Sequence, residues 1–419
     1  MLKDSGLIDG NYYYNTELFD NLPDNYLSEF KIKLAEHQDY ETIKDNFIID
    51  EVNNRLIQIH EKILLSELEE LSDEEKFFYP LCDKPEIRRI FNVKNSNDYL
   101  LKFRAEQVIN NPRINRVFDS IRRKQKNNWN FSEFLDTKLF DIYLEYLPKT
   151  EKDKCRSIPH GSIHLNDANG YCIKTPYGNV VVISFALRHF LYYMNLFHFG
   201  KQLGLNSDDI IPAFILAVRI MIGKEALDFE IDSRGEIPAH IHTEIDIITE
   251  WQMLFVIGHE YAHHYLNHLG KGTTTEFHSF KNREFKYYNF KQQKELEADV
   301  NSIIKPLISE EERSSLADAA FTFFYSLDLY QTVEEYMFPS SKTSATHPEP
   351  NDRILELRKN IDKKYGFSED VILERINYYQ SFKEELINDF LPFNIERIET
   401  YGSVYLPTYK KEVIHDRLL

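Results

Sequence analysis

The chain has 419 residues, of which 42% are hydrophobic and 14% are aromatic, so it holds enough apolar material to fold around a large core. Its 14 glycines and 15 prolines are too few for a collagen-like or low-complexity chain. The 68 acidic and 50 basic residues give a net charge of −18, which excludes a basic surface over the whole fold, and we expect no nucleic-acid partner.

Residues 1–150 are predicted to form an N-terminal helical region of unknown role. Apolar residues recur there at three- and four-residue spacing over 51–71, 99–126 and 132–147, which is the period of an α-helix. The charged segment 149–155 is predicted to be a linker, so a second domain is expected over 151–365. A regulatory partner that engages residues 1–150 is an alternative that stays open.

The second domain begins with two short runs of β-type residues, 171–174 and 180–183. The segment between them, Thr175-Pro-Tyr-Gly-Asn179, places proline and glycine where a hairpin turn needs them. We therefore expect two paired strands. A helix is expected from there to about residue 199, and another begins after Asn206, a good N-cap residue.

Helical periodicity is strongest over 243–269. Residues 271–290 are predicted to be a polar loop, and further helices are expected from about 292, over 311–337 and over 351–364. A loop over 339–350 separates the last two, and residues 366–419 are predicted to be a C-terminal helical extension. The expected fold class is α+β and predominantly helical, with a small β-sheet.

Neither the cysteines nor the apolar runs indicate an extracellular or membrane protein. Cys82, Cys155 and Cys172 are odd in number and widely spaced, which fits neither a disulfide framework nor a thiolate zinc site. The first residues lack the apolar stretch of a signal peptide. The most apolar run, 180–199, contains Arg188 and Asn195, so we expect no membrane span and a cytoplasmic protein.

The segment His259-Glu-Tyr-Ala-His263 is the strongest functional signal in the sequence. On a helix, positions i and i+4 share one face, so His259 and His263 can bind one metal ion through their imidazoles. Glu260 lies about one step around the helix, where it can reach a water molecule that the metal activates. This is the arrangement of a metalloprotease general base.

Glu295 is the predicted third ligand, because zinc hydrolases use three protein ligands and keep one position open. It opens the segment Glu295-Leu-Glu-Ala-Asp299 on the next predicted helix. Asp299, one turn further, could accept a hydrogen bond from a ligating imidazole and fix its tautomer. Glu297 is expected to face away. His264 and His268 are expected to lie off the ligand face of their helix.

Together the two motifs resemble the gluzincin zinc peptidases, above all the family of the HtpX heat-shock proteases, the CAAX-prenyl proteases and the soluble minigluzincins. The segment 169–183 is similar to the strand pair of that family, and Thr346-His-Pro348 with Arg353-Ile354 is similar to its C-terminal S-T-H-P motif. The resemblance covers about residues 165–360. It implies a zincin-like core and one Zn²⁺ ion per chain.

The resemblance also implies roles for further residues. His347 would help to stabilise the transition state, and Arg353 would support the site. An edge strand would bind the substrate peptide by β-augmentation, and we assign it to Val180, Val181, Val182 and Ile183. The expected function is that of a zinc-dependent endopeptidase that acts on a protein or peptide substrate.

Two other functions stay open at this point. One is a zinc hydrolase that acts on a non-peptide amide. The other is a non-catalytic interaction module that zinc stabilises.

Overall fold

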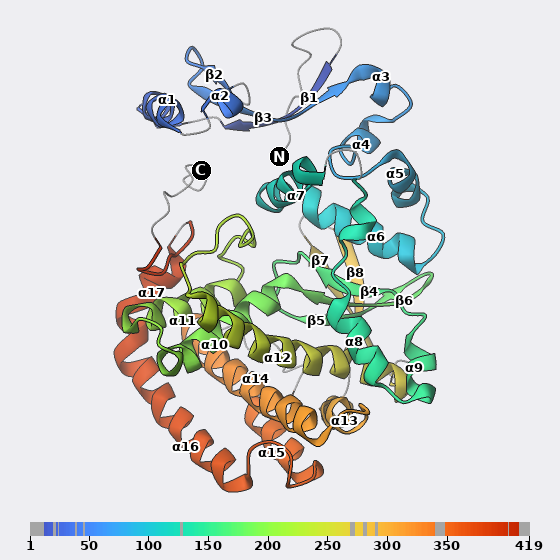
Figure 1. The fold of residues 1–419 in the computed structure, drawn as a ribbon, viewed down its shortest axis with the longest axis vertical. Coiled ribbons are helices and arrows are strands. Elements are labelled where there is room, and N and C mark those ends of the chain that lie inside the picture. Colours follow the sequence, from blue (N-terminus) through green and yellow to red (C-terminus); the bar gives the residue numbers. More distant parts are fainter. Residues whose placement is uncertain are drawn as a thin grey trace. The chain divides into compact units, whose positions relative to one another are not determined.

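The computed structural model describes residues 12–19, 22–23, 25–37, 40–44, 47–125, 129–268, 273–279, 283–289, 292–339, 348–400 and 402–409. These residues form two compact units, and Figure 1 labels their elements. The first unit comprises the described parts of Met1–Asn92 and Ala105–Glu133. The second comprises Val93–Arg104 and the described part of Phe134–Lys410.

The first unit contains a three-stranded antiparallel sheet that the sequence did not predict. Its strands are β1 (Tyr12–Phe19), β2 (Phe47–Asp50) and β3 (Arg55–Leu64), in the order β1-β3-β2. The predicted helix over 51–71 is therefore wrong. Ile57, Ile59 and Ile63 occur at even spacing, and this period-two pattern of β-branched residues outweighs the helical one once β1 and β2 supply partners.

The remaining elements near the N-terminus are helical. The predicted helix over 99–126 is two helices, because Pro112 starts a new one and proline is favoured at a first helical position. The helices are α1 (Tyr26–Glu36), α2 (Tyr40–Ile43), α3 (Leu65–Leu68), α4 (Asp73–Lys76), α5 (Lys84–Phe91), α6 (Ser96–Ile109), α7 (Pro112–Gln125) and the 3₁₀ helix η3 (Phe131–Phe134).

The second unit contains a five-stranded mixed sheet. Its strands are β4 (His160–Ile163), β5 (Gly170–Thr175), β6 (Gly178–Ser184), β7 (Thr273–Ser279) and β8 (Arg283–Asn289), in the order β4-β6-β5-β8-β7. The β5–β6 hairpin is confirmed. The predicted loop over 271–290 is wrong, because β7 and β8 form an antiparallel pair within it.

The strand β6 is not an edge strand. It pairs in parallel with β4 on one side and antiparallel with β5 on the other. Residues Val180–Ile183 have no exposed surface. The prediction that Val180, Val181, Val182 and Ile183 form a substrate-binding edge is therefore wrong, because the short segment 160–163 supplies the second partner and gave no strand signal.

The second unit is mostly helical, as predicted. The segment 149–155 is a helix, so the predicted linker is wrong. The helices are α8 (Lys138–Tyr146), α9 (Lys149–Cys155), α10 (Phe185–Leu203), α11 (Ser207–Met221), α12 (Ala239–Tyr265), α13 (Gln292–Ile304), α14 (Glu310–Met337), α15 (Pro350–Asn360), α16 (Glu369–Glu385), the π-helix η5 (Leu386–Phe390) and α17 (Leu391–Glu399).

The long helix α12 is central to this unit and packs against α8, α10, α13 and α14. Gly258 allows the close approach of α8, because a Cβ atom there would lie 2.5 Å from the Tyr143 ring. The Tyr143 hydroxyl donates to the carbonyl oxygen of Ser302 on α13. Tyr143 thus touches both helices that carry the predicted metal ligands. None of the described helices combines the length and the apolar character that crossing a bilayer requires.

Candidate metal centre

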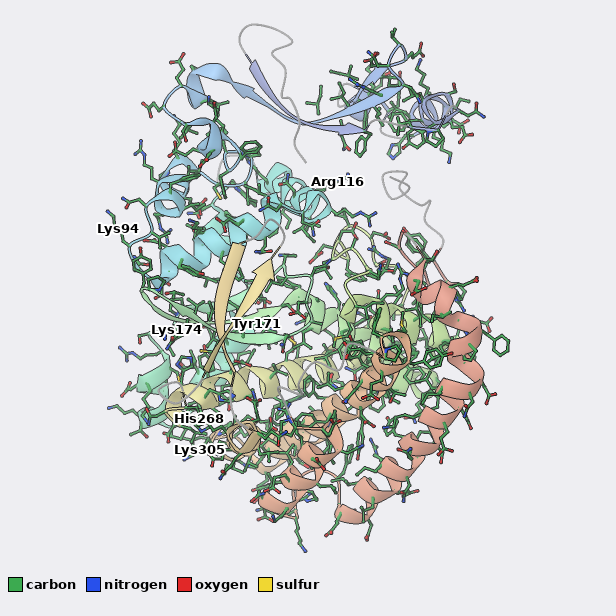
Figure 2. All side chains as sticks on the ribbon, turned by 180° about the vertical axis from the view of Figure 1, so that it is seen from behind. Lys94, Arg116, Tyr171, Lys174, His268 and Lys305 are labelled. Atoms are coloured by element: carbon green, nitrogen blue, oxygen red, sulfur yellow. The ribbon has the colours of Figure 1, made fainter. Side chains whose placement is uncertain are left out.

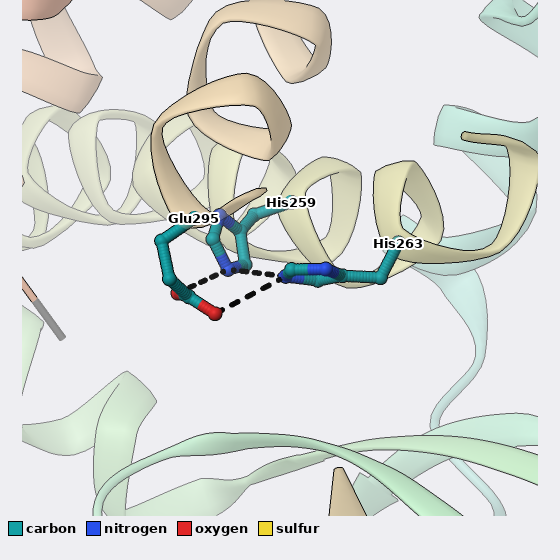
Figure 3. Close-up of side chains that lie close together, drawn as sticks. All are labelled: His259, His263 and Glu295. Atoms are coloured by element: carbon teal, nitrogen blue, oxygen red, sulfur yellow. Dashed lines mark hydrogen bonds and ion pairs between the residues drawn. The ribbon is translucent and has the colours of Figure 1, made fainter. Parts of the chain in front are cut away.

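Two helices bring the three predicted ligands together. His259 and His263 are one turn apart on α12, and Glu295 lies on the first turn of α13 (Figure 3). All three side chains are buried. The two imidazole Nε2 atoms are 3.1 Å apart, and the Glu295 carboxylate oxygens lie 3.3 Å from Nε2 of His259 and 3.6 Å from Nε2 of His263.

These distances fit a tetrahedral metal ion. Zinc–nitrogen and zinc–oxygen bonds of about 2.0–2.2 Å at tetrahedral angles place two ligand atoms about 3.3 Å apart. The two Nε2 atoms, at 3.1 Å, lie close to that value, and each of them has one of the two Glu295 carboxylate oxygens within 3.6 Å. Two imidazoles and one carboxylate are also a donor set that suits zinc. Among the described residues, this is the group of histidine, cysteine and acidic side chains that could hold a metal.

Asp299 fixes the orientation of His259, the first predicted ligand. Its Oδ1 lies 2.8 Å from Nδ1 of His259, so this nitrogen is the donor and the Nε2 lone pair of the neutral ring points to the ligand group. Arg353 on α15 binds Asp299 twice, from Nε at 2.7 Å and from a terminal nitrogen at 2.6 Å. The Nε2 lone pair of His259 therefore faces Nε2 of His263 and the Glu295 carboxylate. A cation between these groups would be stabilised by all three.

In the metal-free protein, a proton takes the place of that cation. Burial opposes a charge on His259, but its hydrogen bonds with Asp299 and Glu295 outweigh burial and raise its pKa to about 10. Burial and the charge of His259 hold the pKa of His263 well below its ordinary value. One imidazole of the pair is thus protonated at neutral pH.

Zinc binding is expected to release about one proton per ion at about pH 8, because His259 must give up its proton to ligate. Since its pKa is raised to about 10, the apparent zinc affinity should rise about tenfold per pH unit towards pH 10. Calorimetric titrations in two buffers with different ionisation enthalpies measure the released proton. Equal heats in the two buffers contradict this prediction.

Glu260 lies beside the strand β5 and outside the ligand group. Its side chain is buried, and burial raises its pKa to about 7, with the charge of His259 acting in the opposite direction. A Cβ atom on Gly170 would lie 3.2 Å from Oε1 of Glu260, so the absence of a side chain there lets the backbone of β5 approach the carboxylate. Glu260 thus has the environment of a proton acceptor that works near neutral pH.

The ion pair of Asp299 and Arg353 also connects the helices around the ligand group. Burial would raise the pKa of Asp299, but Arg353 and His259 outweigh it and lower that pKa below its ordinary value. The Arg353 guanidinium lies over the Phe324 ring, 4.4 Å from its centroid. Arg353 on α15 therefore contacts α13 through Asp299 and α14 through Phe324.

Replacing Arg353 with methionine is expected to destabilise the metal-free protein by about 3–5 kcal/mol, because Asp299 would remain buried without its cation. Urea unfolding of both proteins measures the change. Lys359→Met on the same helix, where the side chain is 75% exposed, is the matched control and should change stability by less than about 0.5 kcal/mol. A loss below about 1 kcal/mol for Arg353→Met contradicts the assigned role.

Of the other predicted site residues, His347 lies outside the described residues, and Pro348 begins the segment that follows. Its predicted role stays a prediction. Arg353 reaches the centre through Asp299 and contacts no ligand in the hydrogen bonds and ion pairs of the described residues.

The sequence did not predict that His268 contacts one of the predicted ligands. His268 was expected to lie off the ligand face, yet its Nδ1 is 3.0 Å from Nδ1 of His263. Glu297, which was expected to face away, lies outside the group of His259, His263 and Glu295, and its carboxylate is 3.2 Å from Nε2 of His268. The prediction continued the helix to residue 269, whereas α12 ends at Tyr265 and the chain turns back. The asparagine at 267 is the signal that could have located this end.

The chain was compared with family models, curated proteins and solved structures, and none of them matches it.

Proposed function

We propose that this chain is a zinc-dependent endopeptidase. The observation that carries the proposal is the convergence of His259, His263 and Glu295 from two helices, with Glu260 on the adjoining helical position. Two imidazoles and a carboxylate within 3.6 Å of one another, with a buried glutamate beside them, are the parts that metal-assisted hydrolysis of an amide needs. A structural zinc site needs no such glutamate.

The chain's own residues perform the proton transfers in this proposal. When bound, zinc lowers the pKa of a coordinated water towards 7 and polarises the scissile carbonyl. Glu260 takes the proton from the attacking water and then gives it to the leaving amine. Asp299 and Arg353 keep the ring of His259 oriented throughout.

The position of β5 supports a peptide substrate. The ladder between β5 and β8 comprises two residue pairs, Ile173 with Tyr287 and Lys174 with Lys286. Within the described residues, this ladder does not reach Gly170, which lies beside Glu260. An extended peptide that pairs with this part of β5 would bring a backbone carbonyl close to Glu260. We assign substrate binding to this segment instead of β6.

The direct test is hydrolysis of denatured casein and of a mixture of unstructured peptides by the zinc-loaded protein. We expect internal cleavage that stops on chelation and returns when zinc is added back. Mass spectrometry of the products distinguishes internal cuts from trimming of the ends. If the zinc-loaded protein leaves both substrates intact, peptide hydrolysis is contradicted, and small amides become the next substrates to test.

A further inference from the structure

The end of α12 turns the chain back over the second predicted ligand. Asn267 has a left-handed backbone with φ 59°, a conformation that asparagine tolerates better than most residues. The N–H of His268 donates to the carbonyl oxygen of His263 at 2.9 Å, and the N–H of Asn267 donates to that of His264 at 3.0 Å. These two bonds form a Schellman motif, in which the residue after the left-handed one contacts the last helical turn.

His268 is that residue, and Figure 2 labels it at this end of α12. The residue is only 4% exposed. Its Nδ1 lies 3.0 Å from Nδ1 of His263, and its Nε2 lies 3.2 Å from a carboxylate oxygen of Glu297 on α13. Lys294, also on α13, donates to the carbonyl oxygen of His268 at 3.0 Å.

The tautomers of His263 and His268 follow from metal binding by His263. An imidazole that gives its Nε2 lone pair to a metal carries its hydrogen on Nδ1. His263 therefore donates from Nδ1, so Nδ1 of His268 is the acceptor. The neutral ring of His268 then carries its hydrogen on Nε2, which donates to Glu297. Each contact has one donor and one acceptor.

We propose that His268, held by Glu297, is a positioning residue that fixes the tautomer and the ring orientation of the ligand His263. This inference rests on the proposed zinc site. His268 does for the second ligand what Asp299 does for the first, with a neutral acceptor in place of a carboxylate. Because Glu297 and the ligand Glu295 lie on the same helix, the contact also fixes the end of α12 against α13.

The experiment measures the zinc dissociation constant of the full chain by competition with a chromophoric chelator. His268→Leu removes the acceptor, and we expect zinc binding to weaken about 10- to 100-fold. His268→Asn places an amide oxygen close to the position of Nδ1, so it should restore the affinity to within about fivefold of the wild-type value.

The matched control is His198→Asn, which alters a half-buried histidine that lies away from the ligand group. Its ring contacts Ser326 and Tyr379 and belongs to α10, so this variant should keep the wild-type zinc affinity even where it lowers stability. Thermal unfolding of the metal-free variants separates a loss of folding from a loss of zinc binding.

Two results would overturn the inference while the proposed function stands. One is wild-type zinc affinity in His268→Leu. The other is an equal loss in His268→Leu and His268→Asn, which would assign His268 a packing role. Failure of the wild-type chain to bind zinc overturns the proposed function, and this inference with it.

Discussion

Glu260→Gln is expected to keep zinc at the wild-type level and to lower kcat/KM for peptide hydrolysis about 10²- to 10⁴-fold, the contribution typical of general acid–base catalysis. Glutamine has nearly the same shape as glutamate, so the packing of α12 against β5 should be preserved. Its amide cannot accept the proton of the attacking water. The buried position of Glu260, with its pKa raised to about 7, suits the glutamate to that task.

The control for this variant is Glu244→Gln, the same change at an exposed position of the same helix. Both variants should contain zinc in the wild-type amount, and Glu244→Gln should hydrolyse peptides at the wild-type rate. Initial rates over a range of peptide concentrations separate kcat from KM, and we expect the loss in kcat. Full activity in zinc-loaded Glu260→Gln contradicts the general-base assignment.

The ligand group could be predicted because its spacing depends on little besides helical periodicity. His259 and His263 share a face of any regular helix, and the structure confirms the helix that carries them. Glu295 and Asp299 lie one turn apart on α13, so a correct prediction of this helix places both side chains on the same face. The structure then brings the two helices together, a step that no local pattern encodes.

The position of His268 could not be predicted from helical periodicity alone. Continuing α12 to residue 269 turns its side chain away from the ligands, whereas the observed end at Tyr265 turns it towards them. A difference of a few residues in a helix end therefore reverses the role assigned to a side chain. Helix ends depend on backbone conformations such as that of Asn267, which the apolar pattern does not report.

The sheets were harder to predict, because strand pairing is decided between distant segments. The hairpin of β5 and β6 is local and was predicted, but β4 pairs with β6 from another part of the chain and makes it an internal strand. β7 and β8 are rich in polar residues and were predicted to be a loop. β8 pairs with β7, its neighbour in the sequence, and with the distant β5, and this pairing forms strands that their polar composition does not indicate.

The second large effect is expected from Glu295, the proposed third ligand. Glu295→Ala removes the carboxylate of the group and leaves two imidazoles, which hold zinc far more weakly than three ligands do. Glu295 is 1% exposed, and its carboxylate, which lies near both ring nitrogens, is the acidic member of the described ligand group. Alanine is a good helix former, so α13 should keep its structure.

Elemental analysis of the purified wild-type protein and of Glu295→Ala, with Glu244→Ala as the matched surface control, tests the central claim most directly. The account predicts about one zinc ion per chain in the wild-type protein and in the control, and at least about a tenfold lower content in Glu295→Ala. Equal zinc in all three proteins, or none in the wild type after zinc is supplied, would contradict a metal centre built from His259, His263 and Glu295.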